Sequence, residues 1–223
     1  MPARRGLFIT FEGLDGSGKS TQITRLAESL TARGLEVLAT REPGGSAIGE
    51  QIRSILLDSR TRGLAPEAEL ALMFADRSQH VEEVIEPALK AGKIVVSDRY
   101  TDSTEAYQGF GRKLGSEVVL DMHRRLCRDL WPDLTLLLES ELDRSVARAR
   151  NRNQSSQSHE GRFESEDAAF FRRVHQGFDQ IARREAERVI KIASATIQIV
   201  EAEILKTVEV RFPHLTTRAP VIR

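Results

Sequence analysis

The chain has 223 residues, of which 40% are hydrophobic, and its 33 basic and 33 acidic side chains give a formal net charge of zero. This length and composition predict one domain with a full hydrophobic core. The balanced charge excludes a non-specific attraction to nucleic acid or to a membrane, so any phosphate binding must come from locally placed basic residues.

A single cysteine, Cys127, excludes an internal disulfide and a zinc cluster and fits a reducing cytoplasm. The apolar stretch after the first residues is too short for a secretory signal, and no segment reaches transmembrane length. We therefore expect a soluble, cytoplasmic protein without a membrane partner.

Short apolar runs of strand length alternate with helical patterns along the chain, which predicts a parallel sheet covered on both faces by helices. The strands are predicted at Leu7–Phe11, Glu36–Thr40, Lys93–Ser97, Asp133–Glu139 and Val189–Ala193. The helices are predicted at Lys19–Arg33, Ala47–Asp58, Pro66–Ala91, Ser116–Leu130, Glu141–Arg150, Glu166–Arg188 and Ile199–Phe212. The third helix is expected to break near Glu86-Pro87, because proline disfavours helix at the residue before it.

The segment Asn151–Glu160 is polar, lacks a periodic pattern and is flanked by arginines. Such a segment cannot contribute to a core, and its flanking charges favour a phosphate-covering lid over an interdomain linker. We therefore assign residues 1–214 to a single domain with a lid at about 148–164, and residues 215–223 to a flexible tail.

The first predicted strand leads directly into the phosphate-binding pattern G-x-x-x-x-G-K-[ST]. Glycines permit a tight turn whose N–H groups point inward at an anion, and the helix that follows adds the positive end of its dipole. In this pattern Lys19 reaches the β- and γ-phosphates, and the hydroxyl of Ser20 binds Mg²⁺. The predicted ATP-binding residues are Gly13, Leu14, Asp15, Gly16, Ser17, Gly18, Lys19, Ser20 and Thr21.

A phosphate loop alone is compatible with switches, motors and kinases. The chain contains neither the guanine-binding pattern Asn-Lys-x-Asp nor the Leu-Ser-Gly-Gly-Gln of transport ATPases. Asp98 and Arg99 instead follow the third predicted strand, and ligands of parallel sheets bind outside the carboxyl ends of the strands. An acid and a base at that edge suit metal-bound phosphates.

Four blocks of the chain resemble those of the bacterial thymidylate kinases in order and approximate spacing, and the resemblance covers about residues 6–210. The blocks are Phe11–Ser20, Thr40–Gly45 (Thr-Arg-Glu-Pro-Gly-Gly), Ser97–Tyr100 and Ala106–Gly109, and Pro132–Leu136 and Arg148–Arg152 extend them. The resemblance implies a three-layer P-loop nucleoside-monophosphate-kinase-like fold with a five-stranded parallel sheet flanked by helices. It also implies phosphoryl transfer from ATP to thymidine 5′-monophosphate (dTMP) with Mg²⁺, and a homodimer.

Site roles follow from the same resemblance. Arg53 and Arg99 match positions that grip the acceptor monophosphate, and Tyr107 matches the residue that crowds the sugar 2′-position. The acceptor-binding residues are Asp15, Glu42, Arg53, Phe74, Arg77, Arg99, Thr104, Tyr107 and Gln108, of which Arg77, Thr104 and Gln108 read the base. The implied catalytic residues are Lys19, Arg99, Arg150 and Arg152, and Ser20 and Asp98 are the implied metal ligands.

The sequence departs from the family pattern in three places. The aromatic residue expected one helical turn before Arg77 is displaced, because Met73 stands four residues before it and Phe74 three. We assign the base-stacking role to Phe74, with a place in the core as the alternative. The phosphate loop carries no arginine, which resembles the branch that supplies the catalytic arginine from the lid. Gly161 stands where the lid-closing motif has an aspartate.

Two rival functions stay open at this point. The nearer is a kinase for another nucleotide, deoxynucleotide or nucleoside, although Arg53 and Arg99 together favour an acceptor that already carries a phosphate. The other is a catalytically silent nucleotide-binding protein on the same fold, against which the intact Lys19, Ser20 and Asp98 argue.

Replacing Arg150 or Arg152 with alanine should lower kcat more than it weakens acceptor binding, because a charge clamp over both nucleotides stabilises the transferring phosphoryl group. Steady-state kinetics with ATP and dTMP measures both quantities. Unchanged turnover in both variants would contradict the lid assignment.

Overall fold

The computed structural model describes residues 5–61, 63–140 and 161–215. Its centre is a sheet of five strands in the order β2-β3-β1-β4-β5, and every neighbouring pair is parallel. The strands are β1 (Phe8–Glu12), β2 (Val37–Arg41), β3 (Ile94–Asp98), β4 (Leu134–Leu138) and β5 (Val189–Ile192). All five predicted strands are confirmed, because buried apolar runs bounded by turn residues mark such strands clearly.

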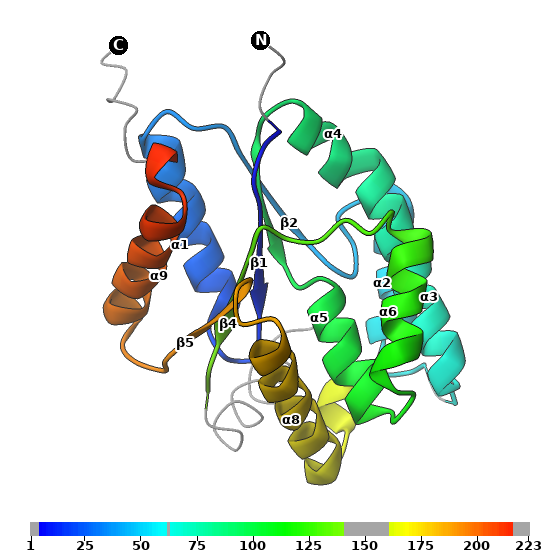
Figure 1. Ribbon diagram of the computed structural model, residues 1–223. Helices are drawn as coiled ribbons and strands as arrows, with labels where there is room; N and C mark the ends of the chain where they lie inside the picture. Colours follow the sequence, from blue (N-terminus) through cyan, green and yellow to red (C-terminus); the bar gives the residue numbers. More distant parts are fainter. Residues whose placement is uncertain (1–4, 62, 141–160, 216–223) are drawn as a thin grey trace.

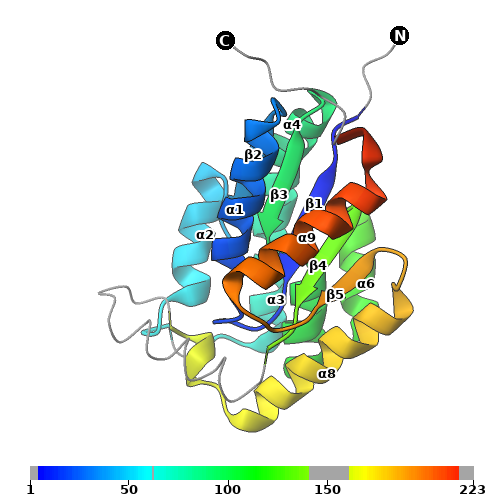
Figure 2. The same ribbon diagram turned by 90° about the vertical axis from the view of Figure 1, so that its left-hand side faces the viewer.

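Helices cover both faces of the sheet, as Figures 1 and 2 show, with α1 and α9 on one face and the remaining described helices on the other. The α-helices are α1 (Lys19–Ala32), α2 (Ala47–Leu57), α3 (Pro66–His80), α4 (Glu86–Lys90), α5 (Thr101–Thr104), α6 (Ser116–Leu126), α8 (Ala168–Arg184) and α9 (Ile197–Arg211). Two segments are π-helical, η1 (Val81–Ile85) and η2 (Glu105–Gly111), and two are short 3-10 turns, η3 (Phe163–Ser165) and η4 (Pro213–Leu215).

The predicted break near Glu86-Pro87 is wrong, because the chain continues through the proline as a helix. The wide turn of η1 ends just before Pro87, and the Glu86 N–H donates to the carbonyl of Val81, five residues back. A π-turn removes the clash that a proline ring makes with the carbonyl four residues earlier.

Two other helix predictions need correction. The helix predicted to end at Leu130 ends at Leu126, because Arg128 and Asp129 adopt positive φ angles of 55° and 52°. The helical stretch formed by α5 and η2 directly after β3 was not predicted. The helix predicted at Glu141–Arg150 lies outside the described residues.

One face of the sheet carries a continuous apolar core. Ile9 and Phe11 of β1 point to this face together with alternate residues of β3 and β4. They pack against Leu26 of α1 and Ile204 of α9, each only 1% exposed. Leu215, which the sequence assigned to the tail, is 5% exposed and belongs to this cluster. This core fixes α1 against the sheet and thereby fixes the loop that precedes it.

The opposite face carries a buried chain of polar contacts at its centre. The hydroxyls of Thr10 and Thr135 lie 2.8 Å apart on the paired strands β1 and β4. Thr135 donates to Asp102, whose carboxylate also accepts two hydrogen bonds from Arg188 at 2.7 and 2.9 Å. Buried polar groups are tolerated when they are paired in this way.

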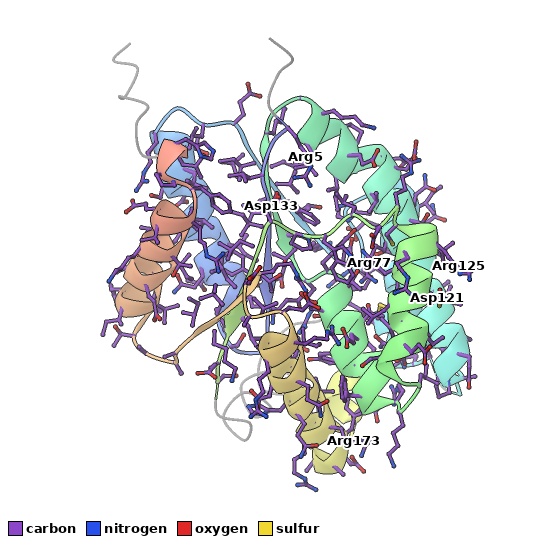
Figure 3. All side chains as sticks on the ribbon, viewed as in Figure 1. Arg5, Arg77, Asp121, Arg125, Asp133 and Arg173 are labelled. Atoms are coloured by element: carbon purple, nitrogen blue, oxygen red, sulfur yellow. The ribbon has the colours of Figure 1, made fainter. Side chains whose placement is uncertain are left out.

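Hydrogen bonds and an ion pair also link segments at the amino ends of β1 and β4. Asp133 accepts the N–H of Phe8 at 2.7 Å and forms an ion pair with Arg5 at 2.9 Å, and both side chains are labelled in Figure 3. None of the described helices is long and apolar enough to span a membrane.

Replacing Leu26 with alanine should lower the free energy of unfolding by about 2–5 kcal/mol, because it opens a cavity between α1 and the sheet. Urea denaturation measures the loss. Ile199→Ala on α9 is the matched control, since Ile199 is 57% exposed and its truncation should change stability by less than about 0.5 kcal/mol. Equal losses in the two variants would contradict this account of the core.

Candidate active site

The loop between β1 and α1 has the backbone that the phosphate-binding pattern predicts. Gly13, Gly16 and Gly18 adopt φ angles of 129°, 79° and 99°, which L side chains rarely adopt. A Cβ at Gly13 would also lie 2.5 Å from the carbonyl oxygen of Leu138. The N-terminus of α1 follows at Lys19, so the loop combines inward N–H groups with a positive helix end.

Lys19 lies across the mouth of this loop. Its Nζ donates to the carbonyl oxygens of Gly13 and Leu14, both at 3.0 Å, and the residue is 6% exposed. Burial, together with a smaller effect of the nearby charge of Arg99, lowers the pKa of Lys19 to about 8. A bound polyphosphate would supply the negative charge that this ammonium group lacks.

Ser20 and Asp98 bring two oxygen ligands together beside the loop. The Ser20 hydroxyl donates to Oδ2 of Asp98 at 3.3 Å. Oδ1 of Asp98 is buried and has no hydrogen-bond partner among the described residues. A hydroxyl beside an unsatisfied carboxylate oxygen suits a hard cation such as Mg²⁺. The described residues hold no group of three or more metal-binding side chains, so such an ion would need ligands from a nucleotide as well.

Arg99 joins the end of β3 to the phosphate loop. Its Nη2 donates to Asp15 at 2.8 Å, its Nη1 donates to Ser103 at 2.7 Å, and its guanidinium lies 5.1 Å from the ring centroid of Tyr107. The Tyr107 hydroxyl also donates to Asp15, at 3.2 Å. The φ angle of Arg99 is 72°, a strained value for arginine, and such strain is concentrated at functional sites.

Glu12 supports Arg99 through the hydroxyl of Ser103. It was not predicted as a site residue. The fully buried carboxyl group of Glu12 accepts the Tyr100 N–H at 2.8 Å and the hydroxyl of Ser103, which itself accepts from Arg99. Burial raises the pKa of Glu12 to about 8, and the neighbouring charge of Asp102 adds to the effect.

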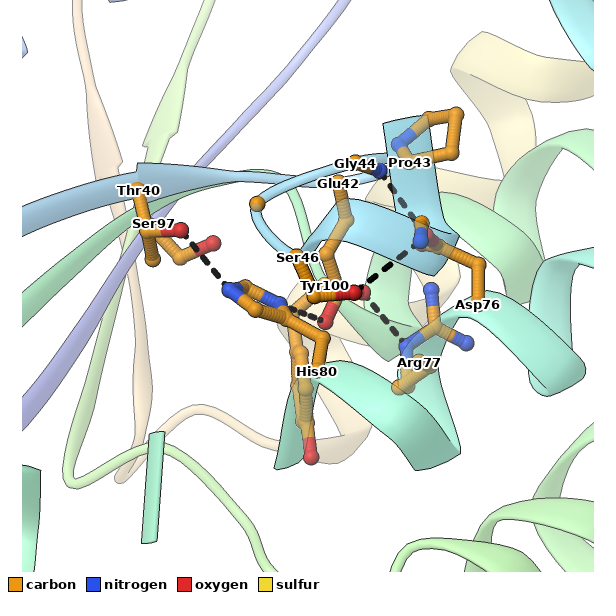
Figure 4. A network of polar contacts seen from close by, with 12 residues as sticks. Thr40, Glu42, Pro43, Gly44, Ser46, Asp76, Arg77, His80, Ser97 and Tyr100 are labelled. Atoms are coloured by element: carbon orange, nitrogen blue, oxygen red, sulfur yellow. Dashed lines mark hydrogen bonds and ion pairs between the residues drawn. The ribbon is translucent and has the colours of Figure 1, made fainter. Parts of the chain in front are cut away.

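A second buried network fixes Arg77 (Figure 4). Its Nε donates to Glu42 at 2.6 Å, and its Nη2 donates to Thr104 at 2.9 Å. His80 connects the same carboxylate, at 2.9 Å, to the hydroxyl of Thr40, at 2.7 Å. Asp76 accepts the N–H of Gly44 at 2.9 Å and so holds the loop that carries Glu42.

Two of the buried polar atoms that lack a partner belong to Arg77 and Gln108. Nη1 of Arg77, a donor, and Oε1 of Gln108, an acceptor, have no partner among the residues that the structure describes. Gln108 is 1% exposed and lies one helical turn after Thr104, the partner of Arg77. A donor and an acceptor of this kind require a ligand with complementary groups.

Phe74 and Met73 lie in different parts of the core. Phe74 is fully buried with Leu70 and Val81 in the cluster beneath α3 and β3, and its ring contacts the guanidinium of Arg77 at 5.0 Å. Met73 is 8% exposed and belongs to the cluster that contains Tyr107. Met73 thus shares a hydrophobic cluster with Tyr107, whereas Phe74 packs beside Arg77.

The remaining predicted arginines lie in different parts of the chain. Arg53 on α2 donates to the carbonyl of Pro43 at 2.8 Å, which puts it beside the loop that carries Glu42. The catalytic candidates Arg150 and Arg152, like Arg148, lie outside the described residues. Arg162 is 8% exposed and donates to the carbonyl of Leu56 and to Glu69.

Comparison with known proteins identifies the family. The chain matches the family described as thymidylate kinase over residues 11–204. It is 51% identical over 184 residues to the thymidylate kinase of Desulfovibrio desulfuricans, with 82% of this chain and 85% of that protein covered. The chain belongs to the thymidylate kinase family.

Further relatives agree with this assignment. The thymidylate kinase of Trichlorobacter lovleyi is 48% identical, with 86% of this chain and 91% of that protein covered. The crystal structure of the Ehrlichia chaffeensis thymidylate kinase aligns with a TM-score of 0.73 at 32% identity, covering 92% of this chain and 99% of that one. The P-loop nucleoside-monophosphate-kinase-like fold is thereby confirmed.

Four polar residues of the thymidylate kinase site escaped sequence reasoning: Glu12, Glu69, Asp76 and His80. Each is at most 1% exposed and pairs with residues that are distant in the sequence. A signal existed for all four, because polar residues interrupt apolar patterns at Glu12 and, at Glu69, Asp76 and His80, on the buried face of α3. Such interruptions mark buried charges that need partners.

Replacing Glu12 with glutamine should flatten the pH dependence of stability. The folded state retains the Glu12 proton up to about pH 8, whereas the ordinary pKa is 4.5. The free energy of unfolding of the unmodified protein should therefore fall as the pH rises from 4.5 through 8. Urea denaturation at pH 5 and pH 9 tests this, and the same decrease in the Glu12→Gln variant would contradict it.

Proposed function

We propose that this protein transfers the γ-phosphoryl group of ATP to dTMP, giving dTDP and ADP. The observation that carries the proposal is the buried pair of unsatisfied groups, the Nη1 donor of Arg77 and the Oε1 acceptor of Gln108. Thymine presents the complement on one edge, with an oxygen acceptor at position 4 and an N–H donor at ring position 3. Cytosine presents the reverse pattern, so it would leave both protein groups unpaired.

We assign the acceptor phosphate and sugar to residues other than those that face the base. Arg53 and Arg99 grip the monophosphate, since a planar guanidinium matches phosphate oxygens. Tyr107 lies against Arg99 and Asp15 and crowds the 2′-position of the sugar. We assign the apolar contact with the base to Met73 in place of Phe74, because Met73 shares a cluster with Tyr107.

We assign the binding of the ATP phosphates to the loop of residues 13–21. Lys19 and Arg99 stabilise the negative charge on the transferring group, which needs positioning and charge neutralisation more than covalent help. The loop itself contains no arginine, so we propose that Arg150 and Arg152 of the lid segment supply the further positive charge. We therefore propose that the chain belongs to the branch of the family with a lid arginine.

Mg²⁺ is the cofactor that fits the unsatisfied oxygen of Asp98 and the neighbouring hydroxyl of Ser20. Bound with the nucleotide, the ion would neutralise phosphate charge. Ser20 and Asp98 would hold and orient it from the protein side, while Lys19 and Arg99 act on the phosphates directly.

We further propose a single domain with a lid at about 148–164, a cytoplasmic location and a homodimer. Ile48 and Ile55 support the dimer, because they are large apolar residues on α2 that are 48% and 47% exposed. They lie seven residues apart on α2, which packs beside α3.

A coupled assay of ADP release tests the proposed function. With Mg·ATP as donor, dTMP should be the best acceptor, exceeding the cytidine and guanosine monophosphates by at least about a hundredfold in kcat/KM. Chelation of Mg²⁺ should abolish the activity, and its return should restore it. A preference for thymidine would instead indicate a nucleoside kinase, and ATP binding without transfer to any acceptor would indicate a silent protein.

A further inference from the structure

We infer that Glu69 is a positioning residue that fixes the side-chain amide of Gln108, with the amide nitrogen inward and the carbonyl oxygen toward the acceptor base. Glu69 thereby determines that the pocket accepts a base with an N–H donor at this point. The inference rests on the proposed function, since it concerns how the same pocket selects its base.

Only one end of the Gln108 side-chain amide has a hydrogen-bond partner among the described residues. Its Nε2 donates to Oε1 of Glu69 at 2.7 Å, while its Oε1 is buried without a partner among the described residues. Gln108 is 1% exposed and Glu69 is fully buried. Gln108 also lies in the π-helical turn η2, a type of turn that is frequent at functional sites.

Two arginines keep Glu69 in its charged form. Arg112 donates to both carboxylate oxygens at 3.1 Å, and Arg162 lies 2.7 Å from Oε2. Burial alone would raise the pKa of Glu69, but the hydrogen bonds from Arg112 and Gln108 hold that pKa below its ordinary value. Glu69 is therefore a carboxylate, and a carboxylate has lone pairs but no proton to donate.

This charge decides the orientation of the amide. An amide has a donor end and an acceptor end of nearly the same shape, so packing alone does not distinguish them. If Gln108 turned over, its carbonyl oxygen would face the Glu69 carboxylate, and both groups would lose a hydrogen bond in a buried environment. Only the orientation with Nε2 on Glu69 satisfies the pair.

The consequence is a fixed acceptor in the base pocket. The N–H at ring position 3 of thymine or uracil can donate to Oε1 of Gln108, whereas the ring nitrogen of cytosine at that position has no hydrogen. Glu69 makes no contact with the base in this arrangement, and it acts through Gln108 alone.

Glu69→Gln tests the inference, because the new amide can donate as well as accept and so releases Gln108 to turn. The ratio of kcat/KM for dTMP over dCMP should fall by about 10- to 100-fold, the effect of losing one buried hydrogen bond from the discrimination. The ratio for dTMP over dUMP should stay within about twofold, since the two bases share the same N–H.

Glu166→Gln is the matched control. Glu166 lies 2.7 Å from Arg112 in the same cluster, and the partner of the Gln108 amide nitrogen is Glu69. Its neutralisation should leave both ratios unchanged. A merely structural role of Glu69 would instead lower the kcat/KM for all three acceptors together, and that outcome would overturn the inference.

A second variant keeps the inference testable if Glu69→Gln does not fold. If circular dichroism finds Glu69→Gln unfolded, Glu69→Asp keeps the charge for Arg112 and Arg162 but shortens the reach to Gln108, and the dTMP/dCMP ratio should again fall. An unchanged ratio in a folded variant overturns the inference while the proposed function stands. Absence of dTMP phosphorylation by the unmodified protein would overturn the proposed function itself.

Discussion

The buried ion pair between Arg77 and Glu42 is the interaction on which the acceptor side of the molecule depends. Both side chains are 2% exposed, and removal of either would leave an unpaired charge in the interior, at a cost of about 3–5 kcal/mol. Glu42 follows β2 and Arg77 lies on α3. Thr104 of α5 accepts a hydrogen bond from Arg77. Three segments that are distant in the sequence are thus held together, and the groups that we propose to face the base are fixed before a ligand arrives.

The hydrophobic pattern and the phosphate-loop motif were sufficient to predict the sheet and the nucleotide-binding end of the site. Every strand boundary agrees with the structure to within two residues, and the loop before α1 has the positive φ angles that its glycines imply. Both features are local in the sequence. A strand is recognised from its own residues, and a glycine-rich turn requires no information about distant segments.

The rest of the site depends on distances that no local pattern contains. Glu69 meets Gln108 across 39 positions of sequence, and Glu12 meets Ser103 across 91. The choice between Met73 and Phe74 is difficult to make from the sequence for another reason. At about 100° per residue, positions three and four before Arg77 lie on either side of its own direction, so the sequence alone does not say which side faces the pocket.

The two faces of the sheet differ in how they would respond to sequence change. The face toward α1 and α9 carries a large apolar cluster, and cores of this kind accept exchanges among aliphatic residues when volume is kept. The face toward the site contains the connected chain Thr10, Thr135, Asp102 and Arg188, in which each group is the partner of another. Substitutions in that chain would be strongly non-additive, so its members can change only together. Evolutionary drift is therefore expected on the α1 side of the sheet, and correlated replacement is expected on the other.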